Sequence, residues 1–148
     1  MDFFTPSATT LLDKIKNICT GYTAMIIWVF FISLLLNFLW TPLQFFYIPE
    51  PIQYTIFFTC IFAPLWEELA FRVIPIKLAL NLNPESLPAV VALSSIIFGF
   101  GHGGVENILI QGVMGVILSW VYIKNNYSYW SSVSLHALWN ITVTILTL

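Results

Sequence analysis

Fold class is set by one run of sequence, residues 22–48, which reads YTAMIIWVFFISLLLNFLWTPLQFFYI. This run contains no charged residue and exceeds the about 20 residues that an α-helix needs to cross a bilayer. It is also longer than the apolar core of a secretory signal, about 7–15 residues, and is therefore interpreted as a retained membrane helix. Pro42 is expected to end or kink this helix, because proline lacks a backbone N–H and clashes with the preceding turn.

The composition also favours a membrane protein. Of the 148 residues, 59% are hydrophobic and 8% are charged, whereas soluble domains carry about 25% charged residues. Five Lys and Arg and seven Asp and Glu side chains cannot cover a soluble surface, and the net charge of −2 argues against nucleic-acid binding. Cys19 and Cys60 have neither disulfide-framework nor zinc-site spacing and are interpreted as small buried hydrophobic residues.

Four further apolar segments follow along the chain, at residues 52–80, 89–100, 108–123 and 130–148. Strong helix breakers separate the second and third segments at residues 81–88, and a polar turn at residues 124–126 precedes the last one. We therefore predict an all-α polytopic membrane protein with about five transmembrane helices. Residues 1–20 are expected to form a cytosolic N-terminal segment, and residues 21–148 a single transmembrane domain.

The lysines predict how the chain is oriented, because cytosolic loops are enriched in Lys and Arg. With a cytosolic N-terminus and five crossings, all four lysines fall on the cytosolic side and the C-terminus lies outside. The outer loops then hold only Glu50 and Glu106. The lysines are Lys14, Lys16, Lys77 and Lys124.

The second apolar segment contains charged residues that lipid disfavours, in the run LWEELAFR at residues 65–72. A charge at the centre of a membrane helix costs about 2.5–3.5 kcal/mol on insertion scales, so an intramembrane carboxylate indicates function by default. Glu68 and Arg72 are four residues apart and can pair on one helical face. Glu67 is rotated by about 100° from Glu68 and is the candidate general base. The alternative is a helix-packing salt-bridge cluster without chemistry.

Both histidines of the chain lie in or beside apolar segments. His102 follows Phe98 by four residues, and His136 precedes Asn140 by four, which puts His136 and Asn140 on one helical face. A lone histidine in an apolar helix is commonly a packing residue, but together with Glu67 these residues indicate one polar site built from three helices. Such a set can activate water as zinc ligands or, without metal, as base and oxyanion stabilisers. The H-E-x-x-H motif of soluble metalloproteases is absent from the sequence.

Straight helices would place the two histidines at different depths. With about 1.5 Å of rise per residue, His102 lies about 20 Å from the turn at Pro88, and His136 lies about 9 Å from Trp130. The glycines at 99, 101, 103 and 104 predict a kinked or broken segment near residues 99–105, which is allowed where backbone lines a water-filled cavity. Alternatively, the third helix begins well outside the lipid. The sequence does not choose between these two explanations.

Three motifs occur in order on apolar segments: Glu67-Glu68-x-x-x-Arg72, Phe98-x-x-x-His102 and His136-x-x-x-Asn140. They resemble the pattern of the CPBP intramembrane proteases, which include CAAX prenyl endopeptidases and bacterial Abi-type relatives. The resemblance implies a membrane endopeptidase that cuts a membrane-associated, prenylated or leader polypeptide. It implies that Glu67 activates water with support from Glu68 and Arg72. His102, His136 and Asn140 would then position the water or stabilise the oxyanion.

The resemblance leaves the metal dependence open, and we favour a metal-free glutamate mechanism. In a Zn²⁺ mechanism, His102, His136 and Glu67 would be the ligands and Glu68 would take over as base. The expected partners are a polypeptide substrate and the lipid bilayer, with no nucleic acid. Many members of the family carry extra helices, so a homodimer or a helper membrane subunit is a further expectation. A bacteriocin-immunity or scaffold protein that acts by binding is the alternative function, and a small proton-coupled transporter is a third.

Overall fold

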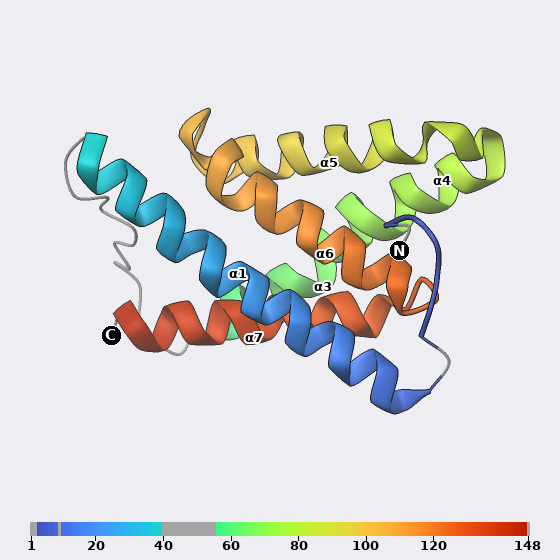
Figure 1. Cartoon of the computed structure of the whole chain (residues 1–148), viewed down its shortest axis with the longest axis horizontal. Coiled ribbons are helices and arrows are strands. Elements are labelled where there is room, and N and C mark those ends of the chain that lie inside the picture. Colours follow the sequence, from blue (N-terminus) through green and yellow to red (C-terminus); the bar gives the residue numbers. More distant parts are fainter. Residues whose placement is uncertain (1–2, 9, 40–55, 148) are drawn as a thin grey trace.

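The computed structural model describes residues 3–8, 10–39 and 56–147, and every regular element in these ranges is a helix. The predicted all-α fold is confirmed there, whereas the expected effect of Pro42 lies outside the described residues. Figure 1 shows the arrangement. The elements are α1 (Leu11–Leu39), η1 (Ile56–Phe62), α3 (Ala63–Glu68), η2 (Leu69–Val73), α4 (Ile74–Leu82), η3 (Pro84–Ser86), α5 (Leu87–Gly101), η4 (Ile108–Gly112), α6 (Val113–Lys124) and α7 (Tyr129–Thr147).

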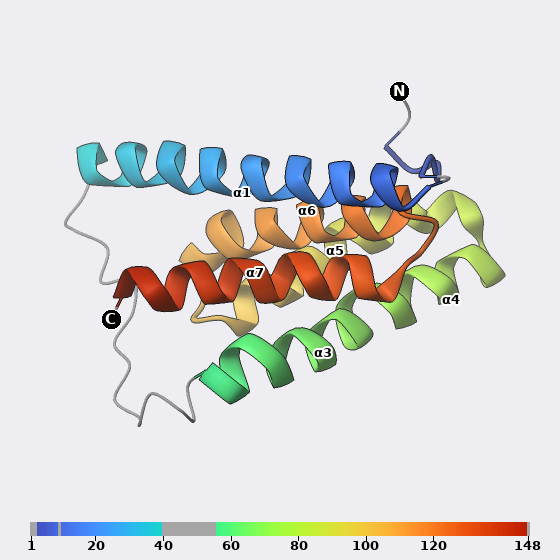
Figure 2. The same ribbon diagram turned by 90° about the horizontal axis from the view of Figure 1, so that it is seen from below.

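These elements form five helical rods that run back and forth through the molecule (Figures 1 and 2). In chain order the rods are α1, the continuous helix 56–82, α5, η4 with α6, and α7. The first rod, α1, begins at Leu11, earlier than the apolar run alone indicated. The second rod is the continuous helix 56–82, in which α-helical turns alternate with the wider turns of η1 and η2. The predicted break near residues 99–105 is present, because α5 ends at Gly101 and η4 begins only at Ile108.

The two wide π-helical segments of the second rod each end shortly before a proline. Pro64 follows η1 and Pro75 follows η2 by two residues. A proline within a helix has no N–H to donate and its ring collides with the carbonyl four residues earlier, so a wider turn at that place relieves the clash. Glu67 and Glu68 lie between these two segments. Short π-helical segments within α-helices are frequent at functional sites.

The central helix is α6, which contributes to both hydrophobic cores. One core joins α6 to α1 and α7, and the other joins it to α4 and α5. Cys60 is buried as expected, but the expectation for Cys19 is wrong, because Cys19 is exposed on α1. The buried residues of the first core are Met25, Met114, Leu118, Val121 and Leu135, and those of the second are Ile76, Ala79, Leu87, Val91, Tyr122 and Ile123.

The N-terminal residues tie the start of α1 to the turn between α6 and α7. The backbone N–H groups of Ser7 and Ala8 donate to the carbonyl of Lys124, at 3.2 and 2.8 Å, and the Lys124 ammonium donates to the carbonyl of Thr5 at 2.9 Å. The turn between α4 and α5 lies at the same end of the molecule (Figures 1 and 2). The lysine-bearing segments of α1, α4 and α6 therefore share one end of the bundle.

The placement of α5 removes the apparent depth mismatch between the two histidines. In both views the turn between α4 and α5 extends beyond the level at which α7 begins (Figures 1 and 2). The first turns of α5 thus lie outside that level, and its C-terminal end reaches the middle of α7. Relative to α7, the third helix therefore starts early, and the break at its end turns the chain back into η4 (Figures 1 and 2).

Gly99 allows α5 to pack tightly against η4. An added Cβ would lie 2.7 Å from the backbone nitrogen of Gly112 and 2.8 Å from the carbonyl oxygen of Asn107. Backbone atoms cannot rotate aside, so we expect Gly99→Ala to lower the free energy of unfolding by about 1–3 kcal/mol. Gly101→Ala is the matched control, because its Cβ would meet no atom within 4 Å. Thermal unfolding of both variants tests this, and equal melting temperatures would contradict the tight packing.

Candidate active site

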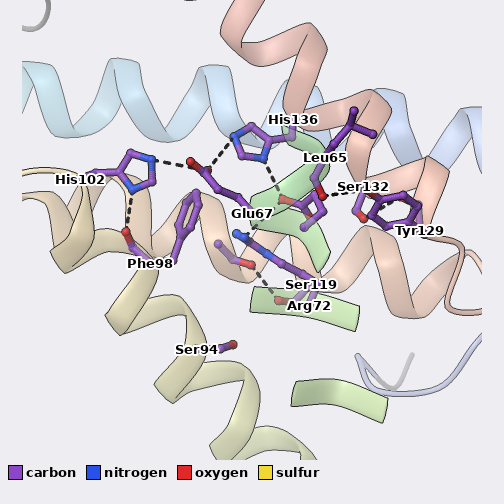
Figure 3. Close-up of polar contacts among 12 residues, drawn as sticks. Leu65, Glu67, Arg72, Ser94, Phe98, His102, Ser119, Tyr129, Ser132 and His136 are labelled. Atoms are coloured by element: carbon purple, nitrogen blue, oxygen red, sulfur yellow. Dashed lines mark hydrogen bonds and ion pairs between the residues drawn. The ribbon is translucent and has the colours of Figure 1, made fainter. Parts of the chain in front are cut away.

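Glu67 lies at the centre of a polar cluster to which three rods contribute (Figure 3). Glu67 belongs to α3, His102 caps the C-terminal end of α5, and His136 lies in α7. The Oε2 atom of Glu67 is 3.7 Å from Nε2 of His102 and 3.6 Å from Nε2 of His136. The structure thus brings together three of the residues that the sequence assigned to one site.

His136 is held by a buried ion pair on its far side. Its Nδ1 is 2.8 Å from Oε1 of Glu68, and the same oxygen is 3.3 Å from Nη1 of Arg72. Glu68 and Arg72 form the ion pair that their i,i+4 spacing predicted, and both side chains are buried. Because an ionised carboxylate only accepts hydrogen bonds, the proton of the His136–Glu68 contact belongs to Nδ1. The Nε2 atom of neutral His136 therefore presents a lone pair toward Glu67.

His102 is oriented by backbone rather than by another side chain. Its Nδ1 is 2.7 Å from the carbonyl oxygen of Phe98, one helical turn earlier. A carbonyl also only accepts, so Nδ1 carries a proton, and in the neutral imidazole Nε2 presents a lone pair toward Glu67. The chain then turns through Gly103 and Gly104, whose φ angles of 133° and 106° favour glycine. Asn107 closes this turn, since its Nδ2 donates to the carbonyl of His102 at 3.0 Å.

When both imidazoles are neutral, Glu67, His102 and His136 direct acceptor atoms at one another. Their separations exceed the about 2.7–3.2 Å of a direct N–H···O hydrogen bond. Oε2 of Glu67 is buried and has no hydrogen-bond partner within the described chain. A buried acceptor without a donor is unfavourable, so the arrangement favours a small proton-bearing group between the three side chains. Water suits this position, because one molecule can donate to Glu67 and to a histidine at the same time.

The ring of Phe98 packs in the middle of these polar groups. The guanidinium carbon of Arg72 lies 4.1 Å from the ring centroid, within the range of a cation–π interaction. The imidazole of His102 is 4.4 Å from the same ring and that of His136 is 5.8 Å from it, centroid to centroid. Phe98 therefore sets the spacing of the two histidines and shields the buried ion pair. This is a structural role for the phenylalanine of the Phe98-x-x-x-His102 motif.

Asn140 is placed differently from the other predicted site residues. Its Nδ2 donates to the carbonyl of Thr59 at 2.8 Å, which ties α7 to η1. Among the described residues, no hydrogen bond joins Asn140 to Glu67, His102 or His136. It lies one turn beyond His136 on α7, and its second N–H is not used by the Thr59 contact.

Tyr129 supports the site, although the sequence did not identify it as a site residue. Its hydroxyl donates to the carbonyl of Leu65 at 2.7 Å and so links the start of α7 to the turn that precedes Glu67. Gly115 has a related role on α6, because a Cβ there would lie 3.2 Å from Nη2 of Arg72. Both contacts join residues far apart in sequence, and neither belongs to a local pattern that could have revealed it.

The cluster of Glu67, His102 and His136 also contains the donor types of a metal site. Glu67, His102 and His136 are of the types that bind zinc, but zinc requires all of its ligands at about 2.0–2.2 Å from one point. Within the described residues, no group of three or more His, Cys, Asp or Glu side chains is placed to hold a metal ion. The chemistry proposed for the site uses the side chains alone, and none of its steps passes through a metal ion.

A cavity of about 680 Å³ adjoins His102 between α1, η4 and α7. Its wall is mainly apolar, and Asn107 and Gln111 are among its few polar side chains. This volume falls within the about 300–1,000 Å³ that ligand pockets occupy. Because His102 faces both Glu67 and this cavity, a bound molecule could reach the polar cluster from it.

Comparison with known proteins bears on the family of the chain. A family model described as type II CAAX prenyl endopeptidase Rce1-like matches residues 49–142, which include all three motifs. No curated protein and no solved structure matches the chain. The match covers more than half of the sequence and confirms the resemblance drawn from the motifs. The chain therefore belongs to the Rce1-like family of type II CAAX prenyl endopeptidases.

Proposed function

We propose that the chain is a polytopic membrane endopeptidase that hydrolyses a peptide bond of a membrane-associated polypeptide with water activated by Glu67. The observation that carries this proposal is the convergence of Nε2 of His102 and Nε2 of His136 on the buried Oε2 of Glu67, at 3.7 and 3.6 Å. Membership of the Rce1-like family supports the same class of reaction.

Several observations support the placement in a membrane. Two described helices, residues 11–35 and 84–101, are long and apolar enough to cross a bilayer, and Ile108–Lys124 is a shorter apolar helix. Large apolar side chains are exposed on several helices, including Ile27, Trp130 and Ile145. Exposed apolar surface on this scale is typical of contact with lipid. In the proposed orientation, the end that carries Lys14, Lys77 and Lys124 is cytosolic and the C-terminus is outside.

The proposed reaction uses Glu67 as the base and then as the acid. Glu67 takes one proton from the water while the water oxygen bonds to the carbonyl carbon of the substrate. The C–N bond of the resulting tetrahedral intermediate then breaks, and Glu67 returns the proton to the departing nitrogen. The second O–H of the water donates to the Nε2 lone pair of one histidine, His102 or His136, which orients the water. The second N–H of Asn140 is proposed to donate to the oxyanion. Glu68 and Arg72 keep His136 in the required tautomer.

The direct test of this function is a cleavage assay with the purified chain in lipid vesicles. Synthetic membrane-inserting peptides, prenylated and unmodified, are incubated with the protein, and the products are identified by mass spectrometry. We expect two products from one internal cut. If correctly folded protein leaves every peptide of a diverse set intact, the proposed hydrolysis is refuted.

Cleavage is expected to be independent of added or removed metal ions. Because Glu67 alone serves as the base in the proposed mechanism, treatment with 1,10-phenanthroline or EDTA should leave the rate within about 2-fold of the untreated enzyme. The rate is measured before and after dialysis, together with the zinc content of the sample. Loss of activity that is restored by zinc would contradict the metal-free mechanism.

A further inference from the structure

Gln111 is a polar residue in an unusual place, on the wall of the apolar cavity beside His102. It belongs to η4, four residues after Asn107, and both side chains line the cavity. The Gln111 carboxamide makes no hydrogen bond or ion pair with the part of the chain that the structure describes. The Oδ1 of Asn107 is similarly available, because only its Nδ2 is used, in the bond to His102.

These amide groups discriminate between possible occupants of the cavity. A hydrocarbon chain that filled the cavity would remove water from Gln111 without replacing its hydrogen bonds, which is unfavourable. A polypeptide main chain offers both an N–H donor and a C=O acceptor, and a carboxamide can pair with both at once. The apolar wall, contributed by residues such as Ile26, Val29 and Leu146, would receive the substrate side chains.

We propose that the cavity binds the substrate as an extended peptide without a lipid group, with apolar side chains against α1 and α7 and its main chain paired to Gln111. This proposal rests on the proposed endopeptidase function and names its substrate class. Continuity supports it, because His102 belongs both to the cavity wall and to the cluster around Glu67. Nε2 of His102 is 3.7 Å from Oε2 of Glu67, so the part of an extended peptide that contacts His102 lies beside the proposed water site. Gln111 is thus a residue that determines specificity through binding.

The test measures binding separately from cleavage. The probes are a fluorescent, end-blocked peptide of five Leu and Ala residues, the same peptide methylated on its main-chain nitrogens, and farnesol. Each is titrated against the full chain in detergent micelles, as the wild type, the Glu67→Gln variant and the Gln111→Leu variant. Gln111→Met provides a second variant that keeps the side-chain length but not the amide.

We expect N-methylation to weaken peptide binding to the wild type and to Glu67→Gln by about 10-fold, as the loss of a buried hydrogen bond predicts. Gln111→Leu should weaken binding of the unmodified peptide to a similar extent and should leave the N-methylated peptide unaffected. Farnesol should bind no more weakly to Gln111→Leu than to the wild type.

The proposal is overturned if N-methylation has no effect on the wild type, or if farnesol binds the wild type more tightly than the unmodified peptide does. The first result requires no mutant, so it stands even if Gln111→Leu does not fold. If the peptide binds as expected but is never cleaved, the endopeptidase function fails while the inferred binding mode holds. If only prenylated peptides are cleaved and bound, the function holds and this inference fails.

Discussion

Glu67→Gln is expected to reduce peptide cleavage by about 10²–10⁴-fold, the contribution typical of a general base. Glutamine has nearly the same shape as glutamate but cannot take a proton from water, so the effect should fall on kcat rather than on KM. The rate is measured with a single peptide in lipid vesicles, at equal amounts of folded protein.

Glu85→Gln is the matched control for Glu67→Gln. Glu85 is exposed in the turn between α4 and α5, away from the site, and its removal should leave the rate unchanged. Equal melting temperatures of the two variants would show that the loss of activity is chemical. A Glu67→Gln variant that cleaves at the wild-type rate would eliminate Glu67 as the base. If this variant still protected cells against a bacteriocin without cleaving, the alternative role in immunity by binding would be favoured.

Arg72→Met is expected to destabilise the fold by about 3–5 kcal/mol, the cost of leaving a buried charge without its partner. Arg72 is 1% exposed and is 3.3 Å from Oε1 of Glu68, which is 0% exposed. The substitution removes the positive charge from beside Glu68 and the cation from the face of Phe98. Thermal unfolding in detergent, followed by tryptophan fluorescence, measures the loss.

The double variant Glu68→Gln/Arg72→Met distinguishes the charge from the packing. If the unpaired carboxylate causes the instability, neutralising it should restore a large part of the melting temperature. The double variant should still cleave slowly, because His136 has lost the carboxylate that fixes its tautomer. A double variant as unstable as Arg72→Met alone would show that the packing of the arginine, rather than the ion pair, is responsible.

The helical class of the fold and several of its breaks could be predicted because they depend on local sequence. Long apolar runs require helices, Asn83 and Pro84 interrupt them, and the glycines after Phe100 end α5. The π-helical turns before Pro64 and Pro75 were not predicted, since a proline within an apolar run also permits a kink or a helix end. The start of α1 at Leu11 was also missed, because polar residues at a helix end leave no apolar pattern to follow.

The composition of the site was more predictable than its geometry. Charges and histidines are rare in this chain, so Glu67, His102 and His136 could be identified from their position in apolar segments. Their meeting depends on how far the turn between α4 and α5 extends beyond α7, which no local pattern specifies. Asn140 shares a helical face with His136, but its contact with Thr59 depends on how η1 packs against α7.

The central claim, hydrolysis by water that Glu67 activates, is tested most directly by cleavage in H₂¹⁸O. Wild-type protein and Glu67→Gln are incubated in parallel with one peptide, and the new carboxyl end of the product is analysed by mass spectrometry. We expect a single ¹⁸O atom in the wild-type product and almost no product from Glu67→Gln. A wild-type product without ¹⁸O, or an equal yield of labelled product from Glu67→Gln, would contradict the claim.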